Sequence, residues 1–129
     1  MKVIKERVSK DLTSVVECFD SKGEKFSRIY SVDNQGLLHG VFRQFWDNGQ
    51  LMCETTYNHG VIDGKYSSWY GNGQQRKICH YKQGVLNKNL KEYSFDGKLL
   101  REEKYIDGKQ KYTPQQIETM YRLSKLHTR

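Results

Sequence analysis

Glycine returns at a fixed interval of 24 residues in this chain, at Gly36, Gly60, Gly84 and Gly108. Tyrosine keeps the same interval at Tyr57, Tyr81 and Tyr105. A constant period of this size indicates tandem copies of one small unit, each of which buries its apolar surface against its neighbours. The period therefore restricts the chain to a stacked repeat architecture.

Three complete units follow from this register, at residues 36–59, 60–83 and 84–107. Each unit places Asn-Gly or Asp-Gly between two runs rich in aromatic and apolar residues, as at Asn48-Gly49 between 41–46 and 51–57. This is the strongest short-range hairpin signal, because both turn residues must tolerate a positive φ. We therefore expect a mainly β fold, a single elongated antiparallel sheet of stacked β-hairpin repeats.

The two ends of the chain depart from the repeat. Phe19 precedes Gly23 by the same four residues that separate Phe45 from Gly49, so residues 1–35 are expected to form a degenerate N-terminal β repeat or cap. Residues 36–112 hold the hairpin repeats. In residues 113–129, Thr113-Pro114 and Gln116 form an N-cap signature, which predicts a short C-terminal helix that caps the last hairpin, followed by a basic tail.

Composition excludes several classes. At 129 residues the chain fits one domain, and no stretch reaches the roughly 20 apolar residues that a membrane crossing needs. Charged residues occupy the N-terminal region where a signal peptide carries an apolar run, and the three cysteines form no C-x-x-C pair. We therefore expect a cytoplasmic protein in a reducing compartment. The net charge of +7 favours acidic partners.

The recurring string G-x-x-x-G-x-[FY]-x-x-[FW]-[WY]-x-N-G-Q resembles the MORN repeat, and segments 69–74 and 78–84 match it best. It is most similar to the variant found in bacterial antitoxin-like proteins and in repeat families of giant DNA viruses. The resemblance implies a meandering hairpin sheet with a role in protein interaction, scaffolding or membrane apposition. Two departures lie in the third unit, where Lys88 replaces the second glycine and Ser94 replaces the second aromatic residue.

Little in the sequence supports catalysis. Cys79 and His80 are adjacent, but neighbours on a strand point to opposite faces and cannot pair directly. His39, His59 and His127 fall in expected turns or in the tail, and no spacing of His, Cys, Asp and Glu matches a metal-ligand set. We therefore expect no enzymatic activity, no metal and no cofactor.

Aromatic columns offer a candidate partner surface. The tyrosine column and the column of Phe45, Trp69 and Tyr93 recur in every unit and are interpreted as core. Two further columns change residue type between units: one consists of Phe42, Tyr66 and Leu90, and the other of Trp46, Tyr70 and Ser94. This variation favours an exposed interface. The candidate partner-binding residues are Phe42, Trp46, Tyr66, Tyr70 and Leu90.

Basic residues gather near the C-terminus. This candidate basic patch consists of Lys109, Lys111, Arg122, Lys125 and Arg129. Acidic membrane lipid is a possible ligand, whereas nucleic acid is disfavoured because glutamates such as Glu54 and Glu92 dilute the positive field. Three functions stay open at this point: a non-catalytic scaffold that binds a protein or another copy of itself, an antitoxin or immunity protein that occludes a toxin, and a peripheral binder of acidic lipid.

Overall fold

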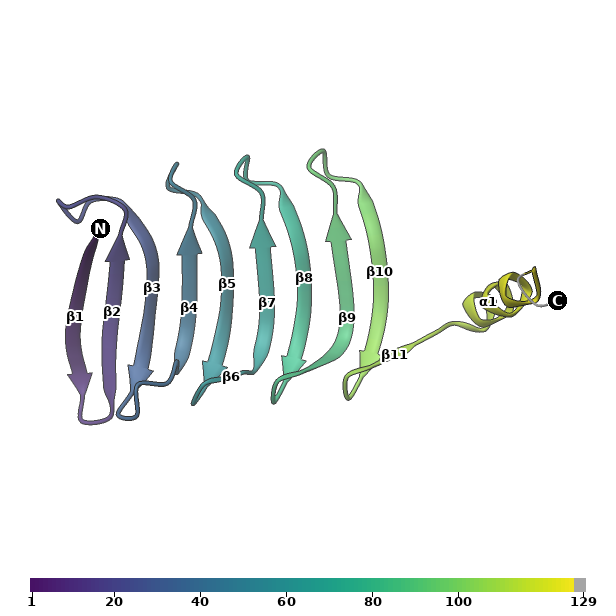
Figure 1. Cartoon of the computed structure of the whole chain (residues 1–129), viewed down its shortest axis with the longest axis horizontal. Helices are drawn as coiled ribbons and strands as arrows, with labels where there is room; N and C mark the ends of the chain where they lie inside the picture. The colour runs from purple at the N-terminus through teal and green to yellow at the C-terminus, as the bar shows by residue number, and fades with distance from the viewer. Residues whose placement is uncertain (127–129) are drawn as a thin grey trace.

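The computed structural model describes residues 1–126, which form one open antiparallel sheet and one helix (Figure 1). The strands follow one another across the sheet in chain order, and β1 and α1 lie at opposite ends of the row (Figure 1). The elements are β1 (Lys2–Ser9), β2 (Leu12–Cys18), β3 (Phe26–Asp33), β4 (Gly40–Phe45), β5 (Leu51–Asn58), β6 (Val61–Ile62), β7 (Gly64–Trp69), β8 (Gln75–Lys82), β9 (Val85–Tyr93), β10 (Leu99–Ile106), β11 (Lys109–Lys111) and α1 (Pro114–Leu126). The predicted fold class is confirmed.

Each 24-residue unit contributes one hairpin with the same register. Gly40 pairs with Tyr57 in the β4–β5 hairpin, Gly64 with Tyr81 in β7–β8, and Lys88 with Tyr105 in β9–β10. Each hairpin also carries a register shift near its turn, as between Gln44 and Phe45. The sequence period is therefore also a period of backbone pairing.

The two kinds of turn are distributed differently from the expectation. At Asn48-Gly49 and its equivalents only the glycine has a positive φ, and Trp46 N donates to Gln50 O across a longer loop. The turns with positive φ at both central residues lie at the opposite ends of the strands, at His59-Gly60, Gln83-Gly84 and Asp107-Gly108. A two-residue loop needs this conformation, whereas a longer loop with a bulge needs only one left-handed residue.

Strand alternation divides the side chains between two faces. One face, called the tyrosine face, carries Tyr30, Phe42, Tyr57, Tyr66, Tyr81 and Tyr105, because these residues are linked through the register of successive strands. The opposite face, called the polar face, carries Arg43, Glu54, Lys65, Trp69, His80 and Lys91. Cys79 and His80 lie on different faces, as the alternation predicts.

The N-terminal strands β1–β3 are joined to the repeats by a short ladder between β3 and β4. Only Arg28 and Ile29 of β3 pair with β4, opposite Gln44 and Arg43. On the tyrosine face the ring of Tyr30 stacks on Phe42 with 5.7 Å between ring centroids. Ring packing thus supplements a short ladder at this junction.

The C-terminal helix forms as predicted but does not cap the sheet. Thr113 Oγ1 accepts from Gln116 N at 3.1 Å, and Gln116 Oε1 accepts from Thr113 N at 2.8 Å, which is a capping box. No residue of α1 is buried, and the helix lies beyond the last strand (Figure 1). The expected capping contact is therefore wrong. Proline at 114 favours an extended Thr113, and the exposed apolar residues of β10 lie at its two ends, with charged residues such as Arg101 and Glu102 between them.

Candidate interaction surface

The tyrosine face is occupied by contacts between neighbouring strands. Phe42 lies between Tyr30 and Tyr57, and its centroid is 6.0 Å from that of Tyr57. Tyr66 meets Tyr81 edge to face at 6.4 Å. Leu90 is only 1% exposed, which corrects its prediction as a partner-contacting residue. Neighbouring strands cover Leu90, and its residue type alone could not show this. On the same face, burial of Tyr81 itself raises the pKa of that side chain to about 12.

The second candidate column bonds one repeat to the next. Trp46 Nε1 donates to the carbonyl oxygen of Trp69 at 3.1 Å, and Tyr70 Oη donates to that of Tyr93 at 2.8 Å. Asn48 Nδ2 likewise donates to Gly71 O at 2.8 Å. Trp46 and Tyr70 are half-buried by these contacts. Their binding of a partner stays a prediction.

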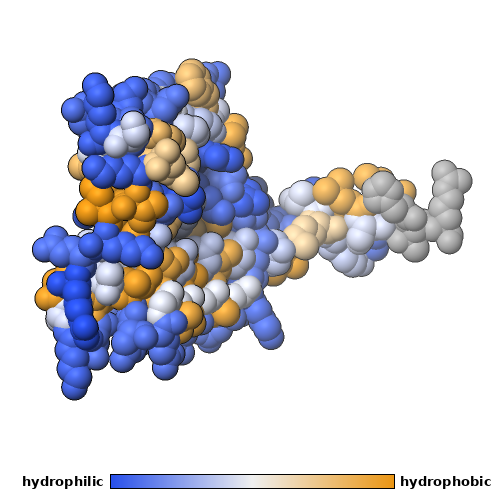
Figure 2. Space-filling view, turned by 60° about the vertical axis from the view of Figure 1, so that its left-hand side comes forward, coloured by the Kyte–Doolittle hydropathy of each residue, from blue (hydrophilic) through white to orange (hydrophobic). Residues whose placement is uncertain are grey.

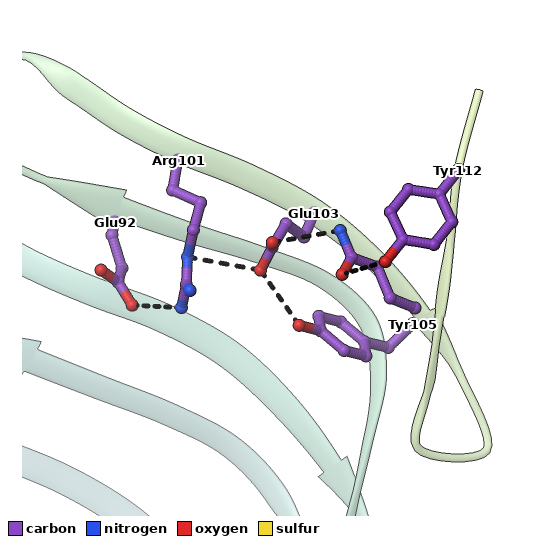
Figure 3. Close-up of polar contacts among 6 residues, drawn as sticks. Glu92, Arg101, Glu103, Tyr105 and Tyr112 are labelled. Carbon is purple, nitrogen blue, oxygen red and sulfur yellow. Dashed lines mark hydrogen bonds and ion pairs between the residues drawn. The ribbon is translucent and has the colours of Figure 1, made fainter. Parts of the chain in front are cut away.

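A polar network closes the tyrosine face at its C-terminal end (Figure 3). Glu103, which stands one period after Cys79, accepts from Tyr105 Oη at 3.0 Å and from Gln110 Nε2 at 3.1 Å. Arg101 bridges Glu92 and Glu103, so β9 and β10 are linked through charge as well (Figure 3). This network places charged, hydroxyl and amide groups on the tyrosine face at β10.

The polar face carries two hollows at equivalent positions of successive repeats. Hollow I has a volume of about 200 Å³ and lies where β5 meets β7; hollow II has about 280 Å³ and lies where β8 meets β9. Five lining positions correspond at the 24-residue step: Glu54 and Ile78, Thr56 and His80, Lys65 and Asn89, Ser67 and Lys91, Trp69 and Tyr93. The sheet thus repeats a concave feature as well as a strand pair.

Charge at the hollows is mixed but includes accessible cations. Arg43 Nε lies 2.7 Å from Glu54 Oε2 beside hollow I, and Lys91 Nζ lies 3.7 Å from Glu102 Oε2 beside hollow II. Lys65 is exposed. Burial, together with the nearby charges of Lys88 and Lys65, lowers the pKa of His80. Its ring is therefore a neutral polar group that lines hollow II near pH 7. Each hollow therefore combines one half-buried ring with amide, hydroxyl or ammonium groups.

Comparison with known families identifies the repeat. A family model described as "MORN repeat variant" matches residues 38–59 and 62–83. This chain carries MORN repeats. The matched segments hold the β4–β5 and β7–β8 hairpins, and hollow I lies between these two MORN repeats. The third unit, with Lys88 and Ser94 at two repeat positions, lies outside the matched segments.

Other comparisons add little. No curated protein matches the sequence. Among solved structures, the one titled "Crystal Structure of TarM" is similar at 12% identity with a TM-score of 0.44, over 96% of this chain and 23% of that chain. MORN repeats are generally protein- or membrane-interaction motifs, and the family is a non-enzymatic repeat.

The candidate basic patch is divided between two elements that follow the matched repeats. Lys109 and Lys111 lie on β11, whereas Arg122 and Lys125 lie on α1. Arg122 pairs with Glu118 at 2.6 Å, and Lys125 Nζ lies 4.7 Å from the centre of the Tyr121 ring. Arg129 lies outside the described residues. The structure thus divides the four described cations between β11 and α1 rather than gathering them on one surface.

Cys79 lies on the tyrosine face, opposite Tyr66. Cys79 is fully buried and burial raises its pKa, which favours the unreactive thiol. Within residues 1–126, no group of three or more His, Cys, Asp and Glu side chains could hold a metal ion. In the same part of the chain no helix has the length and apolar character that crossing a bilayer requires.

Sequence reasoning missed the hollows although their signal was present. The recurrence of Phe45, Trp69 and Tyr93 in each unit predicts a core column. In the structure these rings are half-buried, and Trp69 and Tyr93 line the hollows beside Lys65 and Lys91. A recurrent ring flanked two and four residues away by polar side chains on the same face could have indicated a repeated binding surface.

Proposed function

We propose that this chain is a non-catalytic interaction module that binds a protein partner across its polar face. The observation that supports this function is the pair of equivalent hollows one repeat apart. Adjacent strands lie about 4.8 Å apart, so two strands separate equivalent points by roughly 10 Å. Side chains seven residues apart on a helix are separated by about 10.5 Å along its axis. A helix laid across the strands can therefore place one side chain in each hollow.

The composition of the hollows agrees with a protein ligand. Trp69 and Tyr93 offer half-buried rings, and ring contacts dominate many protein interfaces. Lys65 and Lys91 at the rim offer charge that would favour acidic residues around the inserted side chains. Occlusion of a toxin by an antitoxin-type protein would use the same kind of surface and stays a prediction from the sequence resemblance.

Affinity capture with matched variants tests this proposal. The tagged chain is used to recover partners from cognate lysate, and each recovered protein is then titrated against wild type and against Trp69→Ala/Tyr93→Ala. We expect the double variant to bind at least tenfold more weakly, which is about 1.4 kcal/mol. Tyr121→Ala on α1, which removes an exposed ring outside the hollows, should bind as wild type does. Equal affinities for wild type and the double variant would refute use of the hollows.

A second candidate function is attachment to acidic membrane lipid through α1. Ile117, Met120 and Tyr121 are each about half exposed on a helix with no buried residue, and Arg122 and Lys125 extend from the same helix. A helix with an apolar side and nearby cations is typical of binding at a lipid interface. Sedimentation with phosphatidylserine vesicles at 50 mM and 500 mM salt tests this function. Ile117→Asp/Met120→Asp should abolish binding at low salt if α1 is the attachment site.

A further inference from the structure

Strand β1 is an open edge of the sheet. It is at the end of the strand order and pairs with β2 alone among the strands of residues 1–126. All eight residues from Lys2 to Ser9 are exposed. The backbone N–H and C=O groups on its outer side are therefore available to another extended chain.

Apolar side chains accompany this free backbone. Val3 is 48% exposed, Ile4 42% and Val8 62%. Figure 2 brings the β1 end of the molecule forward and shows orange apolar side chains between blue polar ones at this end. Hydrophobic contacts could thus add to backbone pairing at the edge.

The charge of β1 selects the kind of strand that can pair with it. The strand carries Lys2, Lys5 and Arg7 against Glu6, a net charge of 3 − 1 = +2. Within residues 1–126 none of these four side chains takes part in an ion pair. Lys5 and Arg7 lie on the tyrosine face, since they are opposite Val15 and Thr13, whereas Ile4 lies on the polar face opposite Val16. An acidic side chain placed opposite Lys5 or Arg7 would gain attraction on one face, and an apolar one would meet Ile4 on the other.

The other possible occupant, a second copy, is disfavoured by the same charges. Pairing of two β1 strands would bring together two edges of +2 on chains that each carry +7. The opposite edge of the sheet is also different. There β11 covers β10 from Lys104 to Ile106, and in the free part Glu102 and Glu103 are already paired with Lys91 and Arg101, so head-to-tail pairing with a second copy is disfavoured as well.

We propose that β1 is a docking edge for an extended acidic segment of a partner protein, which adds to the sheet as a further strand. The segment alternates acidic residues, facing Lys5 and Arg7, with apolar residues facing Ile4. The inference rests on the proposed function only in that the ligand is a protein. The edge is separate from the hollows, so one can fail without the other.

Fluorescence anisotropy with labelled peptides tests the docking edge on the full chain at 50 mM salt. The probe is Glu-Val-Asp-Val-Glu-Val-Asp between Gly-Ser flanks. One control replaces its acidic residues by Lys, and a second replaces the central Val by Pro, which removes a backbone donor and disrupts strand pairing. We expect the acidic probe to bind at least tenfold more tightly than either control, and to slow amide hydrogen exchange in residues 2–9.

Variants of the chain locate the site. Lys5→Glu should weaken the acidic probe at least tenfold, whereas Lys104→Glu, the same charge change near the other end of the sheet, should change it less than twofold. Equal binding of the proline probe, or equal loss in both variants, would show that charge alone attracts the peptide and would overturn the docking edge. Sedimentation that shows a wild-type dimer dissociated by Lys5→Glu would also overturn it, because the occupant would then be a second copy.

A cross-test separates this inference from the proposed function. Trp69→Ala/Tyr93→Ala should leave binding of the acidic probe unchanged, because the hollows are not part of the edge. If that variant loses the probe while Lys5→Glu keeps it, the edge inference is wrong and the polar face is the acidic-peptide site.

Discussion

Trp46 Nε1 and the carbonyl oxygen of Trp69 are joined by a hydrogen bond of 3.1 Å that crosses from one MORN repeat to the next. One repeat later, Tyr70 Oη makes the same step to Tyr93 O at 2.8 Å. The series stops at the third turn, where Ser94 Oγ instead donates to Asp96 within its own turn. The turns are thus bonded in one direction along the array, and the last turn is satisfied locally.

Removal of the Trp46 donor should weaken the array measurably. Trp46→Phe retains an aromatic ring but leaves Trp69 O without this donor, so we expect a loss of about 0.5–1.5 kcal/mol in the free energy of unfolding. Urea unfolding measures the change. Tyr70→Phe, which deletes the equivalent hydroxyl, should lose a similar amount. Full stability in both variants would mean that these bonds do not contribute.

Gly84 should not tolerate a side chain. Its φ is +87°, and a Cβ would approach Val61 Cγ1 to 3.2 Å. We expect Gly84→Ala to lower the free energy of unfolding by about 1–3 kcal/mol, because the left-handed conformation is strained for any other residue. Gly71→Ala is the matched control, since a Cβ there meets nothing within 4 Å. Comparable losses at both positions, measured by thermal unfolding, would contradict this explanation.

Replacement of Lys88 by glycine should stabilise the folded protein. It has a φ of +70° and takes the register position that Gly40 and Gly64 hold in the other units. Lys88→Gly should therefore raise the free energy of unfolding by ~0.5–1 kcal/mol, as relief of strain exceeds the entropy cost of glycine. Lys82→Gly, at an exposed position of β8, should lower it instead. A loss of stability at position 88 in urea would refute the strain argument.

Asp33 should make the stability depend on pH in the acid range. Its carboxylate accepts from His59 Nδ1 at 2.7 Å and from Leu37 N and Gln35 N at 2.9 Å each, and these bonds lower its pKa. A lowered folded-state pKa means that its contribution is complete above the ordinary pKa of about 4 and is lost as the pH falls through the folded value. The difference in Tm between wild type and Asp33→Asn should therefore shrink below about pH 4. A difference that stays constant from pH 6 to pH 2 would rule out this role.

Local signals predicted most of the fold, and contacts between distant residues account for the remainder. The positions of β4 and β5 and the capping box at Thr113 follow from turn chemistry and short-range spacing. Alternation also placed Phe42 and Tyr66 on one face. It could not show which side chains neighbouring strands cover, so the burial of Leu90 and the hollows beside Trp69 and Tyr93 were missed. The contact of Asp33 with His59 depends on how two turns are staggered, which no local pattern specifies.

Reactivity of the thiols tests whether Cys79 is accessible in the native state. Cys18 and Cys79 are 0% exposed, whereas Cys53 is half-buried. Burial raises the pKa of both Cys53 and Cys79, so neither forms much thiolate near pH 8, and only Cys53 can meet a reagent without unfolding. Iodoacetamide at pH 8 should modify Cys53 slowly and the other two only in urea, as read by mass spectrometry of peptides. Rapid modification of Cys79 in the folded chain would show an exposed nucleophile and would argue against a purely non-catalytic module.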